Sequence, residues 1–435
     1  MSLYISRLPR ILRRSRSRSS HPEYRSFTSY SSRYNIQPTP SNSESAAHLP
    51  LDFESHDDYT SLPPNFGRNQ IMHVSDETKE RLRQLLWQFE APVRWAIAYG
   101  SGVFSQGTRN AGGKPPMIDL IFGVTYTQHW HSINLKQHRD HYSFLGSFGS
   151  RAVATTQEKL GAGVYFNPYV DIGGVMVKYG VVSIDTLCRD LTSWDTLYLA
   201  GRLHKPVKIL RKDPKVLLAN QMNLLSAVRV ALLLLPEEFT ELQLYTTICS
   251  LSYMGDPRMS LAAENPHKVS NIVTNQLSML RQLYSPLIHQ LPNVYFKNAT
   301  QSTQWTDAPK DTWLVQDMDP IRRGNMVRRL PKSFRERLYF GFQREYGIPR
   351  GEFMKLVGRD EDQERMVKKE GGEWERRIAM DMGLKGQVGQ VIRDTVKWPS
   401  TAQSVKGLLT AGPVKSWHYL GEKFGKYRES KKSGK

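Results

Sequence analysis

The chain has 435 residues, 39% hydrophobic and 23% charged, which allows two or three folded domains with a sizeable core. Its formal net charge of +19 favours an anionic partner: a nucleic acid, a nucleotide or an anionic lipid. Two cysteines, Cys188 and Cys249, argue against a disulfide scaffold and against a cysteine-rich metal site. The most apolar run, 230–235, is short and lies between Arg229 and Pro236, so it predicts a buried helix rather than a membrane span.

The N-terminal segment differs in composition from the rest of the chain. Residues 1–40 are rich in arginine and serine, and Glu23 is their only acid. This composition is typical of a mitochondrial transit peptide, with a basic arm that binds nucleic acid as the alternative. Residues 34–66 are polar and rich in proline and serine, which predicts a linker. We therefore expect a transit peptide and a linker over 1–70.

The first folded domain is predicted over 71–212 and is of the mixed α/β class. It begins with a helix that Asp76 can cap, with leucines at helical spacing. The sequence D-I-G-G at 171–174 predicts a hairpin turn between the last two of four strands. The four short apolar runs that predict strands are 95–99, 117–124, 162–170 and 175–183.

The rest of the chain divides by composition into three parts. Residues 213–300 show helical periodicity with buried leucines and predict a second, mostly helical domain. Residues 301–384 are charged and are expected to be irregular, with a solvated insertion at 359–377. Residues 385–435 form a basic C-terminal tail.

A Gly-Ser-Gly turn follows the first strand and precedes a strand with a lone acid. Glycines at 100 and 102 would let the backbone approach a polyphosphate, Ser101 adds a hydroxyl donor, and the start of the following helix adds amide groups. Asp119, in the next strand, could hold Mg²⁺ against the phosphates. An ordinary turn followed by an exposed strand acid is the alternative.

This pattern resembles the polymerase-β-like nucleotidyltransferases, in which an apolar strand ending in Gly-Ser precedes a D-x-D strand. The chain departs from that pattern at the second acid, where Ile121 stands, and in a long spacer between Ser101 and Asp119. One expected metal ligand is therefore missing from the motif.

A larger set of segments resembles one family, the mitochondrial phosphatidate cytidylyltransferases. These are peripheral CDP-diacylglycerol synthases of the translocator-assembly-and-maintenance type. The likeness is dense over 90–290 and looser over the last 50 residues. The segments, in chain order, are AYGSGVFSQ, MIDLIFGV, WHSINLKQHRDHYSFL, GAGVYFNPYV, KYGVVS, LYLAGRLHKPVKIL, SYMGDPRM and KGLLTAGPVKSWHYLG.

The resemblance implies a reaction in which CTP and phosphatidate give CDP-diacylglycerol and pyrophosphate with Mg²⁺, for cardiolipin and phosphatidylglycerol synthesis. It implies that Gly100, Ser101 and Gly102 hold the triphosphate and that Asp119 holds the metal. The second metal ligand must then come from elsewhere. Asp190 and Asp256 are both candidates, whereas the hairpin turn already explains Asp171.

Cations should balance the triphosphate. Lys178 lies mid-strand and is a candidate catalytic residue, unless strand alternation directs it to solvent. Arg202 and Lys205 are favoured over Lys208 as phosphate ligands, because both lie within the matching segment. Arg258, with Asp256, is a candidate if this turn reaches the cleft between the domains; an ordinary G-D-P turn is the alternative.

A histidine-rich segment supplies weaker candidates. His131 and Asn134 match the family and are expected to line the pocket. The spacing of His131, His138 and His141 could suggest zinc, but no cysteine or H-E-x-x-H pattern supports that.

The tail is expected to dock on a membrane as an amphipathic helix. Residues 385–435 carry eleven lysines and arginines against three acids. After Pro413, Trp417, Leu420 and Phe424 share one helical face, and Lys423 lies nearby. A helix packed on the second domain is the alternative. The seven basic residues of 321–337 fit two alternatives, a second docking patch or a solvated face.

These expectations place the protein on the matrix side of the mitochondrial inner membrane, bound peripherally to a bilayer that holds phosphatidate. Two rival functions stay open. A nucleotidyltransferase acting on RNA should keep the D-x-D pair and show an RNA-binding signature, so no nucleic acid partner is expected. A non-catalytic scaffold for inner-membrane protein assembly would explain the loss of the second acid.

Overall fold

The computed structural model describes residues 62–104, 116–260, 267–297, 312–361 and 371–433. These residues belong to one compact unit. The expected transit peptide and most of the expected linker lie outside the described residues.

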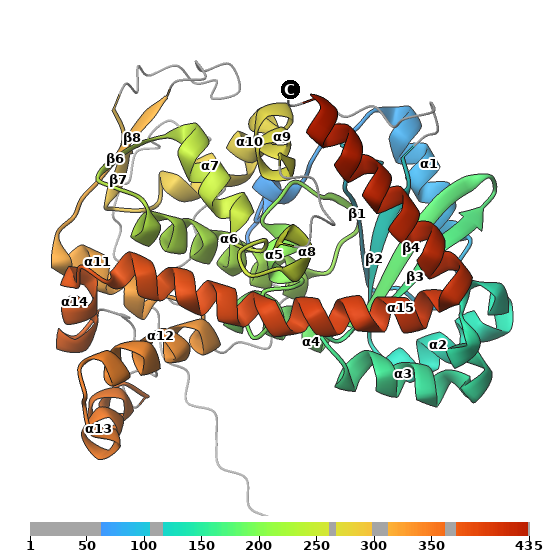
Figure 1. Cartoon of the computed structure of the whole chain (residues 1–435). Helices are drawn as coiled ribbons and strands as arrows, with labels where there is room; N and C mark the ends of the chain where they lie inside the picture. The colour runs from blue at the N-terminus through green and yellow to red at the C-terminus, as the bar shows by residue number, and fades with distance from the viewer. Residues whose placement is uncertain (1–61, 105–115, 261–266, 298–311, 362–370, 434–435) are drawn as a thin grey trace, which may run out of the picture. The chain divides into compact units, whose positions relative to one another are not determined.

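A five-stranded sheet forms the centre of the first predicted domain (Figure 1). Its order is β3-β4-β2-β1-β5, and of these pairings only β2 with β4 is parallel. The predicted hairpin is confirmed, because the backbone N–H of Gly174 donates to Asp171 at 2.8 Å in the turn between β3 and β4. The strands are β1 (Trp95–Tyr99), β2 (Ile118–Val124), β3 (Val164–Ile172), β4 (Val175–Ser183) and β5 (Lys208–Arg211).

Alternating side chains give the sheet two apolar faces. Leu120 and Tyr179 pack with residues of α1 (Asp76–Trp87) and α2 (Thr127–Gln137). Ile97 and Ile121 point the other way and pack with α4 (Ile184–Ser193) and α6 (Pro214–Leu234). α3 (Gly149–Lys159) packs on α2 and β3.

The N-cap of the first helix is Ser75, one residue before the expected cap Asp76. The Ser75 hydroxyl accepts from the backbone N–H of Thr78, so Ser75 is the N-cap and Asp76 is the first helical residue. Serine and aspartate are both common N-cap residues, so the spacing of the leucines does not show which of these two neighbours is the cap.

Helix α6 is the centre of the second predicted domain. It is long and apolar enough to cross a bilayer, but 78% of that window is buried inside the fold, as in a core helix. The core around it continues from the sheet, since Ile97 belongs to the same cluster as Leu224 and Tyr284. The boundary expected near 213 therefore divides the sequence but not the core. The neighbouring elements are α5 (Ala200–Leu203), α7 (Glu241–Ser250), α8 (Pro257–Ser260), α9 (Lys268–Asn275), α10 (Leu277–Ile288), and a sheet of β6 (Glu238–Thr240), β8 (Trp313–Gln316) and β7 (Val294–Phe296).

In its described residues, the charged region expected to be irregular over 301–384 contains four complete helices. The charged residues of these helices suggest exposure to solvent, but several of them are buried in pairs. Glu375 lies 3.8 Å from Arg328 and accepts a hydrogen bond from the Tyr339 hydroxyl. Glu375 and Trp374 lie in the segment expected to be a solvated insertion, yet both are buried. The helices are α11 (Pro320–Arg328), α12 (Lys332–Glu345), α13 (Arg350–Glu361) and α14 (Glu373–Met380).

The C-terminal helix α15 (Leu384–Ser433) is part of the fold over its first half (Figure 1). It contacts α12, α6 and β3. The Lys406 ammonium donates to the carbonyls of Gln157, at 3.2 Å, and Leu160, at the end of α3. The Gln403 amide donates to the Val164 carbonyl at 3.2 Å. Residues 384–410 are therefore a packed element, which contacts both predicted domains.

Candidate active site

Three strands bring a carboxylate, a lysine and a tyrosine together. Tyr99, the last residue of β1, is paired with Asp119 on β2, and Asp119 is paired with Lys178 on β4. The Lys178 Nζ lies 3.4 Å from Asp119 Oδ1, and the two side chains are 23% and 22% exposed. Ile118 and Leu120 point to the α1–α2 face, so Asp119 points to the α4–α6 face. Lys178 thus faces an acid rather than open solvent.

The Gly-Ser-Gly turn lies directly against this acid. Gly100 has φ +80°, and a Cβ there would come within 3.1 Å of Asp119 Oδ2. A Cβ at Gly102 would come within 2.5 Å of the Met117 carbonyl oxygen. Neighbouring atoms therefore lie too close to either position for a larger residue to fit easily. The lack of a side chain at Gly100 leaves the Asp119 carboxylate uncovered. Ser101 is exposed between them. The start of the expected following helix falls within 105–115, outside the described residues.

Arg202 of α5 adds a second cation beside Tyr99. Its guanidinium donates to the hydroxyls of Tyr99, at 3.2 Å, and Tyr198, at 2.7 Å. Within the described chain, Arg202 makes no ion pair with a carboxylate, and its buried Nε has no hydrogen-bond partner. The ring of Phe166 lies 4.7 Å from Lys178 Nζ and 5.6 Å from the Arg202 guanidinium carbon, so one aromatic ring supports both cations. An anion would be the missing partner for this charge.

A second group of polar residues extends the cationic surface. Lys205 donates to the Ser252 hydroxyl at 2.8 Å and lies 4.8 Å from the Tyr253 ring centre. Burial lowers the pKa of Lys205, and the nearby charge of Arg202 acts in the same direction. Ser252 and Tyr253 lie directly after α7, so the segment that begins the turn with Asp256 and Arg258 contacts Lys205.

The two acids considered as a second metal ligand have other partners. The Asp190 carboxylate accepts hydrogen bonds from four backbone N–H groups and one hydroxyl of residues 196–200, which fixes that loop. Asp256 is 2% exposed and pairs with Arg258 at 2.6 Å. Ile121 is fully buried. Both candidate acids therefore already accept hydrogen bonds or pair with a cation inside the fold.

His131 and Asn134 lie on the other face of the sheet. Both are fully buried: His131 hydrogen-bonds with Tyr142 at 2.8 Å and Gln157 at 2.7 Å, and Asn134 donates to Tyr179 at 3.0 Å. Burial lowers the pKa of His131 to about 4, so its ring is neutral near pH 7. Tyr179 follows Lys178 and points away from it. The structure therefore places these two residues in a buried network and not beside the turn.

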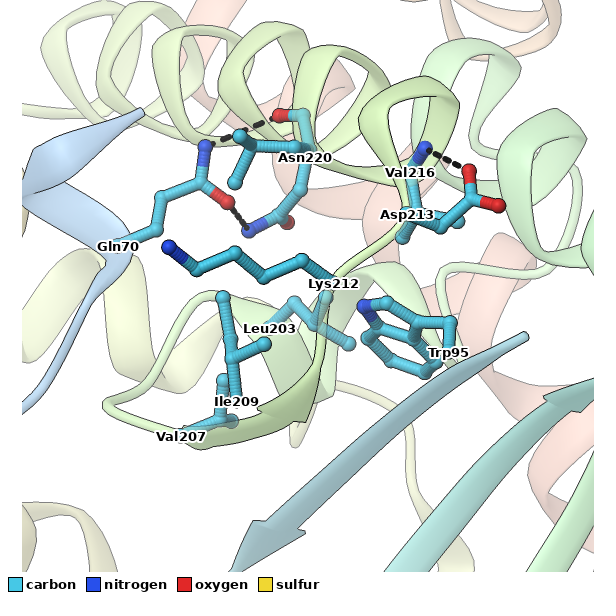
Figure 2. Close-up of a pocket in the computed structure, with 10 residues that line it drawn as sticks. Gln70, Trp95, Leu203, Val207, Ile209, Lys212, Asp213, Val216 and Asn220 are labelled. Carbon is cyan, nitrogen blue, oxygen red and sulfur yellow. Dashed lines mark hydrogen bonds between the residues drawn. The ribbon is translucent and has the colours of Figure 1, made fainter. Parts of the chain in front are cut away.

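Neither of two other sites coincides with the turn. The described residues contain one group of three potential metal ligands, His138, Asp140 and His141. Its two imidazoles are stacked with ring centres 4.3 Å apart and planes 5° apart, so their lone pairs do not converge. A cavity lies beside Gln70 and Asn220, at the far end of β1 from Tyr99 (Figure 2). It measures about 10 Å³ and could hold no more than one water.

Sequence reasoning found Asp119, the glycine turn, Lys178 and Arg202, which the structure brings together. It missed the aromatic residues that hold the cations. The position of Tyr99 next to Gly100, in a strand that ends at the site, was the signal that could have identified it. Phe166, Tyr198 and Tyr253 carry no such signal, because a lone aromatic residue usually belongs to a core.

Comparisons with known proteins agree on one family. The family described as "Phosphatidate cytidylyltransferase, mitochondrial" matches residues 82–426. A protein of that name from Schizosaccharomyces pombe is 37% identical over 359 residues, which is 81% of this chain and 84% of the relative. The Saccharomyces cerevisiae protein of that name is 47% identical over 234 residues, 53% of this chain and 60% of the relative. The Mus musculus protein is 36% identical over 347 residues, 79% of this chain and 94% of the relative.

Proposed function

Because this chain belongs to the mitochondrial phosphatidate cytidylyltransferase family, we propose that it transfers CMP from CTP to phosphatidate, giving CDP-diacylglycerol and pyrophosphate. The observation that carries the proposal is the grouping of Asp119, Lys178 and Arg202 beside the Gly-Ser-Gly turn. We further propose that β1, the turn and β2 are the core of a polymerase-β-like nucleotidyltransferase unit, in which Ile121 replaces the second acid.

The residues suit this chemistry. A phosphate oxygen of the lipid attacks the α-phosphorus of CTP in line, and pyrophosphate leaves. The attacking oxygen is already an anion near neutral pH, so positioning and charge neutralisation matter more than a general base. Ser101 and the turn hold the triphosphate, while Lys178 and Arg202 neutralise it. Lys205 and Arg258 extend the cationic surface towards the phosphate of the second substrate.

The donor chemistry at the turn fits Mg²⁺. Magnesium is commonly held by one or two carboxylates together with substrate phosphates and water, so a single acid is sufficient. Asp119, partly exposed and uncovered by Gly100, would be that ligand, with the Ser101 hydroxyl nearby. When bound, the ion would neutralise charge on the phosphate oxygens.

The lipid substrate requires a membrane-associated enzyme. We propose a mitochondrial protein bound peripherally to the matrix side of the inner membrane, delivered by the Arg/Ser-rich N-terminal segment and serving cardiolipin and phosphatidylglycerol synthesis. Its docking helix would be residues 413–433 of α15, where Trp417, Leu420 and Phe424 supply apolar anchors and Lys423 a cation.

The test is a direct assay. The purified chain is incubated with CTP, Mg²⁺ and vesicles that contain phosphatidate, and CDP-diacylglycerol is measured by mass spectrometry. We expect product from the wild type and a loss of about 1,000-fold or more in Asp119→Asn, which removes the metal-binding charge but keeps the side-chain shape. Asp171→Asn is the matched control, since an asparagine can keep the hydrogen bond from the Gly174 N–H in the hairpin turn.

The rival functions give different outcomes. A wild-type protein that adds nucleotides to RNA but not to phosphatidate would support the RNA-directed reading. A folded, membrane-bound protein with neither activity would support the scaffold. Near-normal turnover in Asp119→Asn at saturating Mg²⁺ would remove Asp119 from the metal site.

A further inference from the structure

A short 3₁₀ helix, η5 (Phe144–Phe148), exposes two phenylalanines next to α15. Phe144 and Phe148 are 54% and 69% exposed, with ring centres 6.4 Å apart. On α15, Val405 and Leu409 are 52% and 42% exposed. The Ser143 hydroxyl donates to the Leu409 carbonyl at 2.9 Å, so the two exposed apolar pairs belong to adjacent elements. We call these four side chains the η5–α15 surface.

Hydrogen bonds hold the backbone on both sides of the η5–α15 surface, so the fold itself keeps these apolar side chains exposed. Arg139 donates to the Ser147 hydroxyl at 2.6 Å and to the Tyr142 carbonyl at 3.1 Å, which holds η5 in place. Behind α15, the buried side chains of Gln403 and Lys406 bond to β3 and to the end of α3. Large apolar side chains held outward in one place mark an interaction site more often than chance exposure.

Charge and continuity identify the partner as an anionic bilayer. In the sequence, the exposed Arg139 and Arg151 stand on either side of the two phenylalanines, and Asp140 is the only acid of residues 139–151. Aromatic and aliphatic side chains bordered by arginine suit a membrane interface, where rings enter the headgroup region and cations meet anionic lipids. Trp398, eleven residues before Leu409 on the same helical face, is 72% exposed.

The sequence of α15 beyond residue 410 carries further apolar residues. In the sequence, Leu420 and Phe424 follow Leu409 by eleven and fifteen residues, which are intervals typical of one face of a helix. The exposed apolar residues of the packed half are therefore followed in the sequence by the apolar residues already expected to meet the membrane. A protein partner would not need this continuity with a basic tail.

We propose that the η5–α15 surface inserts into the interface of an anionic bilayer together with the end of α15, so that the protein docks through two elements. This inference rests on the proposed action on a membrane lipid, and it assigns a docking role to the first predicted domain. A single helix would tether the enzyme, whereas two elements also fix its orientation on the bilayer.

The first test measures vesicle binding. The double variant Phe144→Ser/Phe148→Ser of the full chain is floated with vesicles of phosphatidylcholine containing cardiolipin. We expect vesicle affinity to fall about tenfold or more, because two interfacial aromatic anchors are lost, while CTP binding stays unchanged. Phe340→Ser, which removes a phenylalanine of similar exposure (55%) from α12, is the matched control and should bind like the wild type.

The second test reports insertion directly. An environment-sensitive dye is attached to the cysteine of Phe148→Cys, and separately to that of Phe340→Cys. The native thiols should not react, because both are buried and burial raises the pKa of Cys188 to about 12 and of Cys249 to about 11. We expect a blue shift of dye emission with the same vesicles at position 148 and none at position 340.

These readouts do not depend on catalysis. Unchanged vesicle affinity in the double variant, or no blue shift at position 148, would overturn the inference even if the enzyme makes CDP-diacylglycerol. Loss of binding and a blue shift would support it even if no cytidylyl transfer were found, and in that case the proposed function alone would fail.

Discussion

At the scale of single residues, the chemistry depends on the contacts of one carboxylate. Asp119 is approached by Lys178 on one side and by the backbone of Gly100 on the other. The φ of +80° at Gly100 turns the chain away just after Tyr99, so that the acid stays accessible from the turn. A side chain at position 100 would occupy the space beside Asp119 where the phosphates are expected.

Gly100→Ala should therefore weaken CTP binding beyond its effect on stability. Alanine at positive φ costs about 1 kcal/mol of folding free energy, and its Cβ would in addition press on Asp119 Oδ2. Gly173→Ala is the matched control, because Gly173 also has positive φ (+60°) but a Cβ there meets nothing within 4 Å. Gly100→Ala should lose at least as much stability as Gly173→Ala in urea titrations, and only Gly100→Ala should bind CTP less tightly by calorimetry.

Equal CTP affinity in the two variants would mean that the turn does not hold the nucleotide.

Some residues of the candidate site could be predicted from the sequence and others could not. A glycine turn followed by a lone acid was enough to predict the turn and Asp119, and the mid-strand position of Lys178 made it a candidate. It could not show that Asp190 is occupied by backbone N–H groups, or that His131 lies behind the sheet, because both facts depend on contacts between distant segments.

At the scale of elements, α15 is held by a buried lysine. Lys406 is fully buried and donates to two carbonyls at the C-terminal end of α3, where a cation is also favoured by the helix dipole. Burial lowers the pKa of this ammonium to about 7. The attachment of α15 to the first predicted domain is therefore linked to protonation.

The sign of this linkage predicts a pH dependence. Between about pH 7 and pH 10.5, Lys406 takes up a proton in the unfolded chain but not in the folded one, so the free energy of unfolding should rise with pH across this window. The slope is up to about 1.4 kcal/mol per pH unit. Below about pH 7 both states are protonated, so this group gives no further pH dependence there, and the destabilisation from burying the charged lysine is at its full value. Lys406→Met should flatten the rise, measured by urea unfolding at several pH values.

Lys397→Met, at an exposed position of the same helix, should leave the pH profile of the wild type unchanged. Parallel profiles for wild type and Lys406→Met would contradict the prediction. The sequence analysis predicted a basic membrane-docking tail over 385–435 because it counted the charges of this segment. A lysine bonded to carbonyls some 250 positions earlier in the chain looks the same in sequence as a solvated one.

The same reason explains the helices of 301–384. The pattern of strands and of the long apolar helix α6 was readable because apolar residues dominate those segments. Helices α11 and α14 bury charged partners such as Arg328 and Glu375, so their periodicity is hidden from a hydrophobic pattern.

At the scale of the whole molecule, the structure predicts where the chain can be shortened. A chain that ends at residue 412 keeps Gln403 and Lys406 and should fold and bind CTP. Its activity on phosphatidate in vesicles should fall sharply, because the last part of α15 is the expected docking helix. A short-chain, water-soluble phosphatidate should partly restore turnover, since docking is then unnecessary.

A chain that ends at residue 384 should instead fail to fold cooperatively. It loses the contacts of α15 with α12, α6 and β3. Thermal unfolding of the two truncations separates the roles of the two halves of the helix. A stable fold in the shorter chain would show that 385–412 is dispensable, and loss of CTP binding in the longer one would make 413–433 structural.

The contact between Gln403 and Val164 has a consequence for biosynthesis. β3 is an edge strand, and its cover comes from a residue 239 positions later. A ribosome releases β3 well before it releases α15, and an unfolded chain entering a compartment N-terminus first meets the same delay. During that interval the open edge can pair with strands of other chains, so the nascent protein is vulnerable to aggregation until its final helix arrives.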